Sequence, residues 1–231
     1  MVSHGVFLVR RFLAPEIPAE GDLVQLDEGV SHHLLRVTGI APGETVELFD
    51  GGGISCRAEL VSAAHGVATL KVTEVLERHT PARQVHLVLA HTRASTMDTV
   101  LRMVSELGVA SIQVVQTHRC VAKGNKMERW VRIVQSAAAQ SGRTVVPILH
   151  PPVAFTELIA QTEGTRLICA PGGSVGAPGA GVITLLVGPE GGFTVEEIDE
   201  AVASGWALVG LGETVLRADT AAVVAVARYA F

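Results

Sequence analysis

Apolar positions late in the chain predict a strand that ends in a glycine-rich turn. The run Val182–Val187 is almost uninterrupted, which is typical of a strand buried on both faces in a parallel sheet. Gly188-Pro189 ends the strand, because proline has no N–H for the ladder. Thr194 and Glu197 then have the spacing of a capping box that opens a helix. Such a turn can hold a ligand at the carboxyl end of a strand, although an ordinary strand–turn–helix joint has the same pattern.

The hydrophobic period differs between the first third of the chain and the rest. Residues 1–76 alternate over short runs broken by turns such as Asp50–Gly53, which predicts a small β-barrel. Residues 84–231 alternate apolar runs with stretches of helical spacing, which predicts a parallel sheet with helices on both faces. The polar residues 77–83 show no periodicity and are predicted to be a linker. The strands expected in the first part are Val6–Phe12, Leu23–Leu26, Thr45–Phe49, Ile54–Val61 and Val67–Val75.

Capping residues and terminators place the helices. Ser31 is predicted to cap a short helix over Ser31–Val37, and Ser95 to cap a helix that ends at Gly108. The stretch Pro171–Gly181 is glycine-rich and is predicted to be a loop. The other expected strands are Val85–Ala90, Ile112–Val115, Val145–Leu149, Arg166–Ala170 and Ala207–Leu211, and the other expected helices are Asn125–Ser141, one from Phe155, one over 195–204 and one from about Thr220.

Composition narrows the class of protein. The 231 residues are 48% apolar, which is enough for one large domain or two small ones with a sizeable core. Cys56, Cys120 and Cys169 are far apart and form no CxxC pair, which argues against a disulfide framework and against a zinc site. The sequence has neither the pattern of a signal peptide nor an apolar run of bilayer length. We therefore expect a soluble, cytoplasmic protein that binds neither a metal nor a membrane.

The net charge of −5 argues weakly against a nucleic-acid partner, but its distribution changes that argument. Residues 102–143 hold seven basic side chains and only two acidic ones. Screening limits the reach of the other charges to about 8–10 Å, so this local excess can bind phosphates. A solvated basic helix face is the alternative interpretation.

Several common catalytic motifs are absent from the sequence. It contains no P-loop, no GxGxxG, no HExxH and no GxSxG pattern. Three late segments follow predicted strands and offer backbone amides, carbonyls and small side chains: Cys169–Pro171, Gly188–Gly192 and Leu211–Thr220. Such segments suit a neutral, flat, hydrogen-bonding ligand such as adenine better than a polyphosphate.

Two of these segments resemble a known class of enzymes. GPEGGF at Gly188–Phe193 and LGETVLRADTA at Leu211–Ala221 are similar to the SPOUT class of RNA methyltransferases, and more narrowly to the RsmE family. The resemblance continues through His32–Val37, Arg119-Cys120 and Gln140–Arg143, and so covers almost the whole chain. It implies methylation of N3 of a uridine in 16S ribosomal RNA. The alternatives are a SPOUT enzyme that acts on another RNA site or atom, and a non-catalytic RNA-binding or ribosome-assembly protein.

The resemblance also implies an α/β fold with particular features. These are a PUA-like RNA-binding β-barrel over 1–76, a linker over 77–83, and a SPOUT methyltransferase domain over 84–231 whose parallel sheet carries a deep trefoil knot. S-adenosyl-L-methionine would bind in the knot loops. The implied assembly is a homodimer in which both subunits build each active site.

Individual roles follow from the same resemblance. Arg217 would face the reacting base, where its charge stabilises the anion that forms when uridine N3 loses its proton. The alternative for Arg217 is a buried structural ion pair with Asp219 or Glu190. The residues implied to bind S-adenosylmethionine are Ala170, Gly188, Glu190, Gly191, Leu211, Gly212 and Leu216, and those implied to bind RNA are Arg10, Arg11, Arg36, Arg93, Arg119 and Arg143.

The sequence departs from the family pattern at four positions, one of which is Arg93, where the family commonly has lysine. Asp219 stands where the family usually has glutamate, Gly39 where it has a second basic residue after the His-His pair, and Met103 where it has lysine. These differences concern the RNA contacts more than the methyl transfer.

Overall fold

The chain divides into two compact units. The computed structural model describes residues 10–76, 84–161, 164–174 and 181–230. The first unit comprises Met1–Thr80 and Ala139–Val145, and the second comprises Pro81–Ala138 and Val146–Phe231. The predicted linker 77–83 lies outside the described residues. The sequence pattern did not predict that Ala139–Val145 would belong to the first unit.

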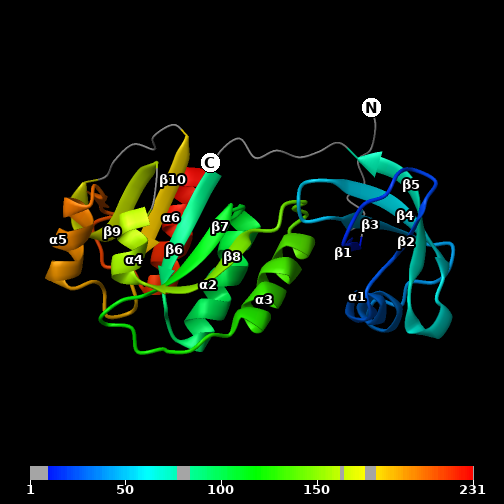
Figure 1. Cartoon of the computed structure of the whole chain (residues 1–231), viewed down its shortest axis with the longest axis horizontal. Helices are drawn as coiled ribbons and strands as arrows, with labels where there is room; N and C mark the ends of the chain where they lie inside the picture. The colour runs from blue at the N-terminus through cyan, green and yellow to red at the C-terminus, as the bar shows by residue number, and fades with distance from the viewer. Residues whose placement is uncertain (1–9, 77–83, 162–163, 175–180, 231) are drawn as a thin grey trace. The chain divides into compact units, whose positions relative to one another are not determined.

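A small curled sheet forms the first unit (Figure 1). Its strand order is β1-β3-β4-β5-β2, with β1 parallel to β3 and the other pairs antiparallel. The alternating side chains of β3 bury Val46 and Leu48 completely, as expected for a sheet with one face on a core. The bounds are β1 Arg11–Leu13, β2 Leu23–Gln25, β3 Thr45–Phe49, β4 Ser55–Ser62 and β5 Thr69–Leu76. Every strand predicted for this unit is therefore present. The part of the first predicted strand before residue 10 lies outside the described residues.

The helix of this unit begins earlier than predicted. Helix α1 (Glu28–His32) is capped by Asp27, whose carboxylate accepts a hydrogen bond from the Val30 amide at 2.7 Å. It continues as a π-helical turn, η1 (His33–Val37). The prediction that Ser31 is the cap was wrong, because the Ser31 hydroxyl is buried and accepts a hydrogen bond from the Ala68 amide at 3.0 Å.

A six-stranded parallel sheet forms the second unit, as predicted (Figure 1). Its order is β11-β9-β10-β6-β7-β8, and every neighbouring pair is parallel. Strand β10 therefore lies between β9 and β6, and it is buried from Ile183 to Val187. The bounds are β6 Gln84–Ala90, β7 Ser111–Gln116, β8 Ile148–Ala154, β9 Thr165–Ser174, β10 Val182–Val187 and β11 Ala207–Val209.

Helices cover both faces of this sheet. Because successive residues of a strand point to opposite faces, Leu185 and Val187 pack in one core with α2, α3 and α6. Val88 and Leu186 pack in the other core with α4 and α5. The helix bounds are α2 Ala94–Leu107, α3 Met127–Gln140, α4 Phe155–Gln161, α5 Val195–Ala203 and α6 Ala218–Ala230. No helix in the described ranges has both the length and the apolar character needed to cross a bilayer.

The helix boundaries confirm some predictions and correct others. Helix α5 begins with the predicted capping box of Thr194 and Glu197, and α2 ends at Gly108, whose φ is +86°. Ser95 was wrongly predicted as a cap: Arg93 occupies the cap position of α2, and its side chain makes no capping hydrogen bond.

The predicted loop Pro171–Gly181 is a strand in its first part. Strand β9 continues through Ser174, and residues 175–180 lie outside the described ranges. The strand continues because β11 pairs beside it, with Val209 aligned to Ser174. The backbones approach so closely there that a Cβ on Gly173 would lie 2.4 Å from the carbonyl carbon of Val209, which explains why this strand position is glycine.

Candidate active site

The turn after β10 is compact and held by its own backbone. The Gly192 amide donates a hydrogen bond to the Pro189 carbonyl at 2.9 Å, and Gly192 has a φ of +68° that favours glycine. The Phe193 ring packs against the other end of the turn, where a Cβ on Gly188 would lie 3.0 Å from the ring. Glycine at 188 therefore allows an aromatic side chain to lie directly on the backbone.

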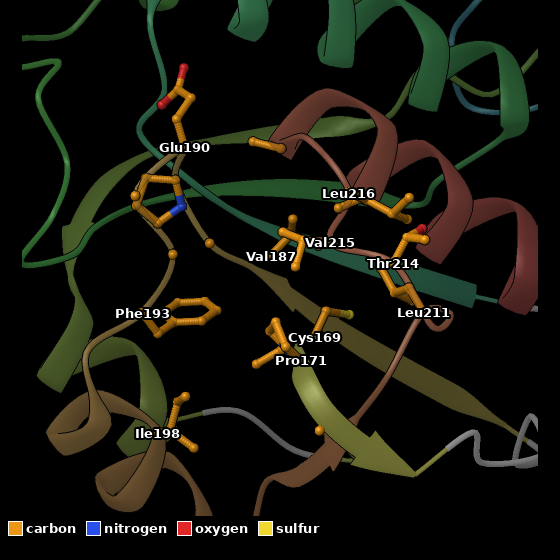
Figure 2. Close-up of a pocket in the computed structure, with 18 of the residues that line it drawn as sticks. Cys169, Pro171, Val187, Glu190, Phe193, Ile198, Leu211, Thr214, Val215 and Leu216 are labelled. Carbon is orange, nitrogen blue, oxygen red and sulfur yellow. The ribbon is translucent and has the colours of Figure 1, made fainter.

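A cavity of about 400 Å³ opens at the carboxyl ends of β9, β10 and β11, and we call it the large cavity (Figure 2). Its walls come from the three late segments that the sequence analysis singled out. Parallel strands end at the same edge of a sheet, so the loops that follow them meet there. All seven residues that the family resemblance assigns to the methyl donor line this cavity: Ala170, Gly188, Glu190, Gly191, Leu211, Gly212 and Leu216.

The walls of the large cavity are mostly apolar. Figure 2 shows Phe193, Val187 and Cys169 facing the same space from different segments. Burial raises the pKa of the Cys169 thiol to about 12, so this side chain is uncharged near neutral pH. Cys169, Thr214 and Val215 of the wall belong to the segments that the sequence pattern singled out, although they were not named as contacts. Arg119, Phe193 and Ile198 lie outside those segments, and sequence reasoning did not assign them to this cavity.

Arg119 supports the turn from outside. Its Nη1 donates hydrogen bonds to the carbonyls of Gly191 at 2.9 Å and Phe193 at 3.1 Å. The neighbouring His118 amide donates to the buried Glu197 carboxylate at 2.7 Å. The segment after β7 is therefore tied to the turn and to the start of α5 by three hydrogen bonds.

Arg217 lies at a second cavity of about 230 Å³, which we call the small cavity. Thr96 of α2, Glu190 of the turn, and Arg217, Ala218 and Asp219 at the start of α6 line it. Glu190 and Ala218 line both cavities, so the two are neighbours. Arg217 thus lines the neighbouring small cavity, which it shares with only one of the seven residues, Glu190.

The alternative role of Arg217 as a buried ion pair does not fit the structure. Its Nε lies 3.6 Å from the Asp219 carboxylate, but the Arg217 side chain is 83% exposed. A pair at that distance and exposure contributes little to stability, because water solvates both charges. Most of the donor capacity of this guanidinium is therefore available to a ligand.

Three of the arginines expected to bind RNA are exposed. Arg10, Arg36 and Arg93 all reach solvent, and Arg10 makes one hydrogen bond, to the Thr38 carbonyl. Arg10 and Arg36 belong to the first unit, whereas Arg93 is in the second, at the cap position of α2.

The other three arginines have structural contacts. Arg11 contacts Glu47 at 2.7 Å, the Arg143 carbonyl at 3.2 Å and the Phe49 ring at 5.1 Å, so each of its three guanidinium nitrogens donates to the protein itself. Burial lowers the pKa of Arg143. Arg119 holds the turn, as described above. Among the described residues, no cluster of three or more His, Cys, Asp or Glu side chains is arranged to hold a metal ion.

Comparison with known proteins identifies relatives over the whole chain. Residues 78–230 match the RNA methyltransferase domain family. A Synechocystis protein named ribosomal RNA small subunit methyltransferase E is 37% identical over 98% of this chain and 78% of its own length.

Solved structures agree with this result. The ribosomal RNA small subunit methyltransferase E of Neisseria gonorrhoeae bound to S-adenosyl methionine has a TM-score of 0.89 and 31% identity, covering 95% of both chains. A putative methyltransferase of Legionella pneumophila in complex with the same molecule has a TM-score of 0.88 and 30% identity, covering 94% of this chain and 95% of the other.

Proposed function

The chain belongs to the ribosomal RNA small subunit methyltransferase E family, and from this premise we propose that it transfers the methyl group of S-adenosylmethionine to N3 of a uridine in 16S rRNA. Methylation of ribosomal RNA with S-adenosylmethionine follows from the family and from the relatives that were solved with that molecule. The base and the atom rest on the resemblance and on the chemistry of the two cavities. A ribosomal substrate places the protein in the cytoplasm.

The large cavity is the proposed site of S-adenosylmethionine, and its walls fit that molecule. Backbone amides and carbonyls of the turn suit the adenine edge, and the apolar side chains of Val187, Phe193 and Leu211 suit the flat ring. When bound, the sulfonium supplies a methyl carbon that is already activated. The chain's own part is to bind and orient the molecule, and the seven residues of the large cavity are the proposed contacts.

Arg217 is the proposed catalytic cation. Uridine N3 becomes a good nucleophile only when its proton leaves, and the negative charge then spreads onto the ring carbonyls. A guanidinium beside those oxygens stabilises the charge that develops in the transition state. Two observations support this role: the exposed donors of Arg217, and the contact between its cavity and the large one.

The knot and the homodimer remain proposals. Strand β10 lies between β9 and β6, and the Gly210 amide donates to the Ser174 carbonyl at 3.1 Å, so the backbones of β9 and the segment after β11 meet closely. The proposed trefoil knot would thread the chain through these segments, at the rim of the large cavity. The proposed dimer would complete each active site with residues of the second subunit.

The proposed domains keep the boundaries 1–76, 77–83 and 84–231. A PUA-like barrel in the first domain would bind RNA through Arg10 and Arg36, and Arg93 would add a contact in the second domain. In this proposal, three of the arginines affect RNA binding only through the structure of the protein. Arg11 pairs with Glu47, Arg119 donates to the glycine-rich turn, and Arg143 is partly buried.

The decisive experiment uses small ribosomal subunits from cells that lack this protein. The purified chain and labelled S-adenosylmethionine should transfer label to 16S rRNA, and nucleoside analysis should find N3-methyluridine. Label at another base or atom would overturn the uridine N3 proposal and favour another SPOUT activity. No binding of S-adenosylmethionine in calorimetry would favour a non-catalytic RNA-binding protein.

A further inference from the structure

The small cavity has polar groups that the seven donor contacts leave unused. It lies between the first turn of α2, which contributes Thr96, and the first turn of α6, which contributes Asp219. It shares Glu190 and Ala218 with the large cavity, so the two cavities are neighbours. Its volume of about 230 Å³ accommodates a single ring system.

We propose that the small cavity is the pocket for the target uracil and that Asp219 accepts its N3 proton. This inference rests on the proposed function, because it concerns the base that receives the methyl group. It assigns the proton acceptor, a role that the family resemblance leaves open.

The hydrogen bonds of Asp219 leave one oxygen available. Oδ1 accepts a hydrogen bond from the Thr220 amide at 2.8 Å and lies 3.6 Å from Arg217 Nε. Within the described ranges, Oδ2 has no hydrogen-bond partner, and neither does Nη1 or Nη2 of Arg217. One available acceptor therefore lies beside two available donors at the same cavity.

Glu190 is the other carboxylate of the small cavity, and its geometry gives it a different role. Its Oε1 accepts a hydrogen bond from the Arg93 amide at 3.2 Å, at the start of α2. Figure 2 shows the Glu190 side chain pointing away from Phe193, Val187 and Cys169. Glu190 is therefore a positioning residue that joins the turn to the helix that carries Thr96.

The pattern of donors and acceptors distinguishes uracil from cytosine. The edge of uracil presents a carbonyl oxygen, the N3–H and a second carbonyl oxygen. Asp219 accepts from the N3–H while Arg217 donates to the adjacent carbonyl. Cytosine has no proton on N3, so its N3 lone pair would face the carboxylate. A buried acceptor that faces another acceptor is unfavourable, because neither can be satisfied.

The proposed step balances without another reactant. The N3–H bond breaks, and the proton moves to Oδ2 of Asp219. The electron pair on N3 forms the bond to the methyl carbon, and the electrons of the sulfur–methyl bond go to sulfur, which leaves as a neutral thioether. Asp219 then releases its proton to water, and Arg217 stabilises the negative charge on the ring carbonyl throughout.

The test is Asp219→Asn, which keeps the size of the side chain and its Oδ1 contact with the Thr220 amide. General-base catalysis contributes about 10²–10⁴-fold, so kcat at neutral pH should fall by about that factor. Calorimetric affinity for S-adenosylmethionine should stay within about threefold of wild type, because Asp219 does not line the large cavity.

Asp219→Glu should restore most of the activity. Asp199→Asn on the exposed side of α5 is the matched control and should change nothing.

A pH profile separates this role from a merely structural one. Uridine N3 ionises by itself in alkaline solution, and the variant no longer supplies an acceptor. The kcat of the Asp219→Asn variant should therefore keep rising above pH 8, while the wild-type kcat levels off. The ratio of wild-type kcat to variant kcat should then decrease as pH increases. A deficit that stays the same at every pH, or an unchanged kcat at neutral pH, would overturn the inference. If the wild-type chain itself makes no N3-methyluridine, the proposed function fails instead, and the two failures are thereby distinct.

Discussion

Arginine is used in opposite ways in the two units of the molecule. In the first unit, the Arg11 side chain is 9% exposed and its guanidinium contacts a carboxylate, a carbonyl and an aromatic ring. In the second unit, the Arg217 side chain is 83% exposed, and its one ion pair within the described residues is with Asp219 at 3.6 Å. Both residues were expected to be functional from the family resemblance. Residue type alone therefore does not separate an arginine that stabilises the fold from one whose donors remain available to a ligand.

Arg119 is intermediate between these two cases. It reaches solvent, yet Nη1 is used by two carbonyls of the glycine-rich turn. Its effect on a ligand is therefore exerted through the shape of the large cavity. The four predictions below test this division between side chains that fold the protein and side chains that act.

The largest effect is expected for Arg217→Gln. Loss of one charged donor at the developing anion should lower kcat by about 10²–10³-fold. The melting temperature should stay the same, because the exposed pair with Asp219 contributes little. Methyl transfer and calorimetric binding of S-adenosylmethionine should be measured together. If turnover and binding both stay near wild type, Arg217 has no catalytic role.

The next largest effect is expected for Arg11→Met, and it should appear in stability alone. The substitution leaves Glu47, whose side chain is 20% exposed, without its partner, which should cost about 2 kcal/mol of unfolding free energy. Denaturant unfolding measures this cost. RNA affinity of the fully folded variant should match wild type, and a large loss of affinity at unchanged stability would show that Arg11 contacts RNA.

A smaller effect is expected for Arg119→Met, which keeps the length of the side chain and its packing beside Gly191. The two lost hydrogen bonds should loosen the turn and weaken binding of S-adenosylmethionine by about tenfold, or about 1.4 kcal/mol. Calorimetry checks this value. RNA binding measured without S-adenosylmethionine should not change, and if RNA affinity alone fell, Arg119 would belong with the contacts to the substrate.

The smallest effect is expected for Arg10→Met. Arg10 is exposed, so the variant should unfold at the same denaturant concentration as wild type. If Arg10 contacts a phosphate, the plot of log affinity for 16S rRNA fragments against log salt should lose about one unit of slope. An identical salt slope would remove Arg10 from the proposed RNA surface. Glu59→Gln, on β4 of the same sheet, is a control that removes no positive charge.

Local patterns predicted the elements that depend on local physics. The apolar run of β10, the proline that stops it and the capping box of α5 are all confirmed, because each depends on residues a few positions apart. Ser31 and Ser95 were wrongly predicted as caps for the opposite reason. Ser31 is drawn into the core by the Ala68 amide, 37 residues away, and the start of α2 is held by Glu190, 97 residues from Arg93.

The same distinction separates the parts of the site that could be predicted from the sequence from those that could not. The three glycine-rich segments could be found from the sequence because each follows a predicted strand, and parallel strands bring such segments to one edge. The small cavity could not, because Thr96, Glu190 and Asp219 become neighbours only through the packing of α2 and α6 around the turn. Neither hydrophobic period nor motif spacing contains that information.

The hydrogen bond from the Arg93 amide to Glu190 links the turn to the start of α2. Glu190 lines both cavities, so one residue borders both the proposed site of S-adenosylmethionine and the proposed site of the base. If binding in one cavity changes the affinity of the other, thermodynamic reciprocity requires the same factor whichever molecule binds first.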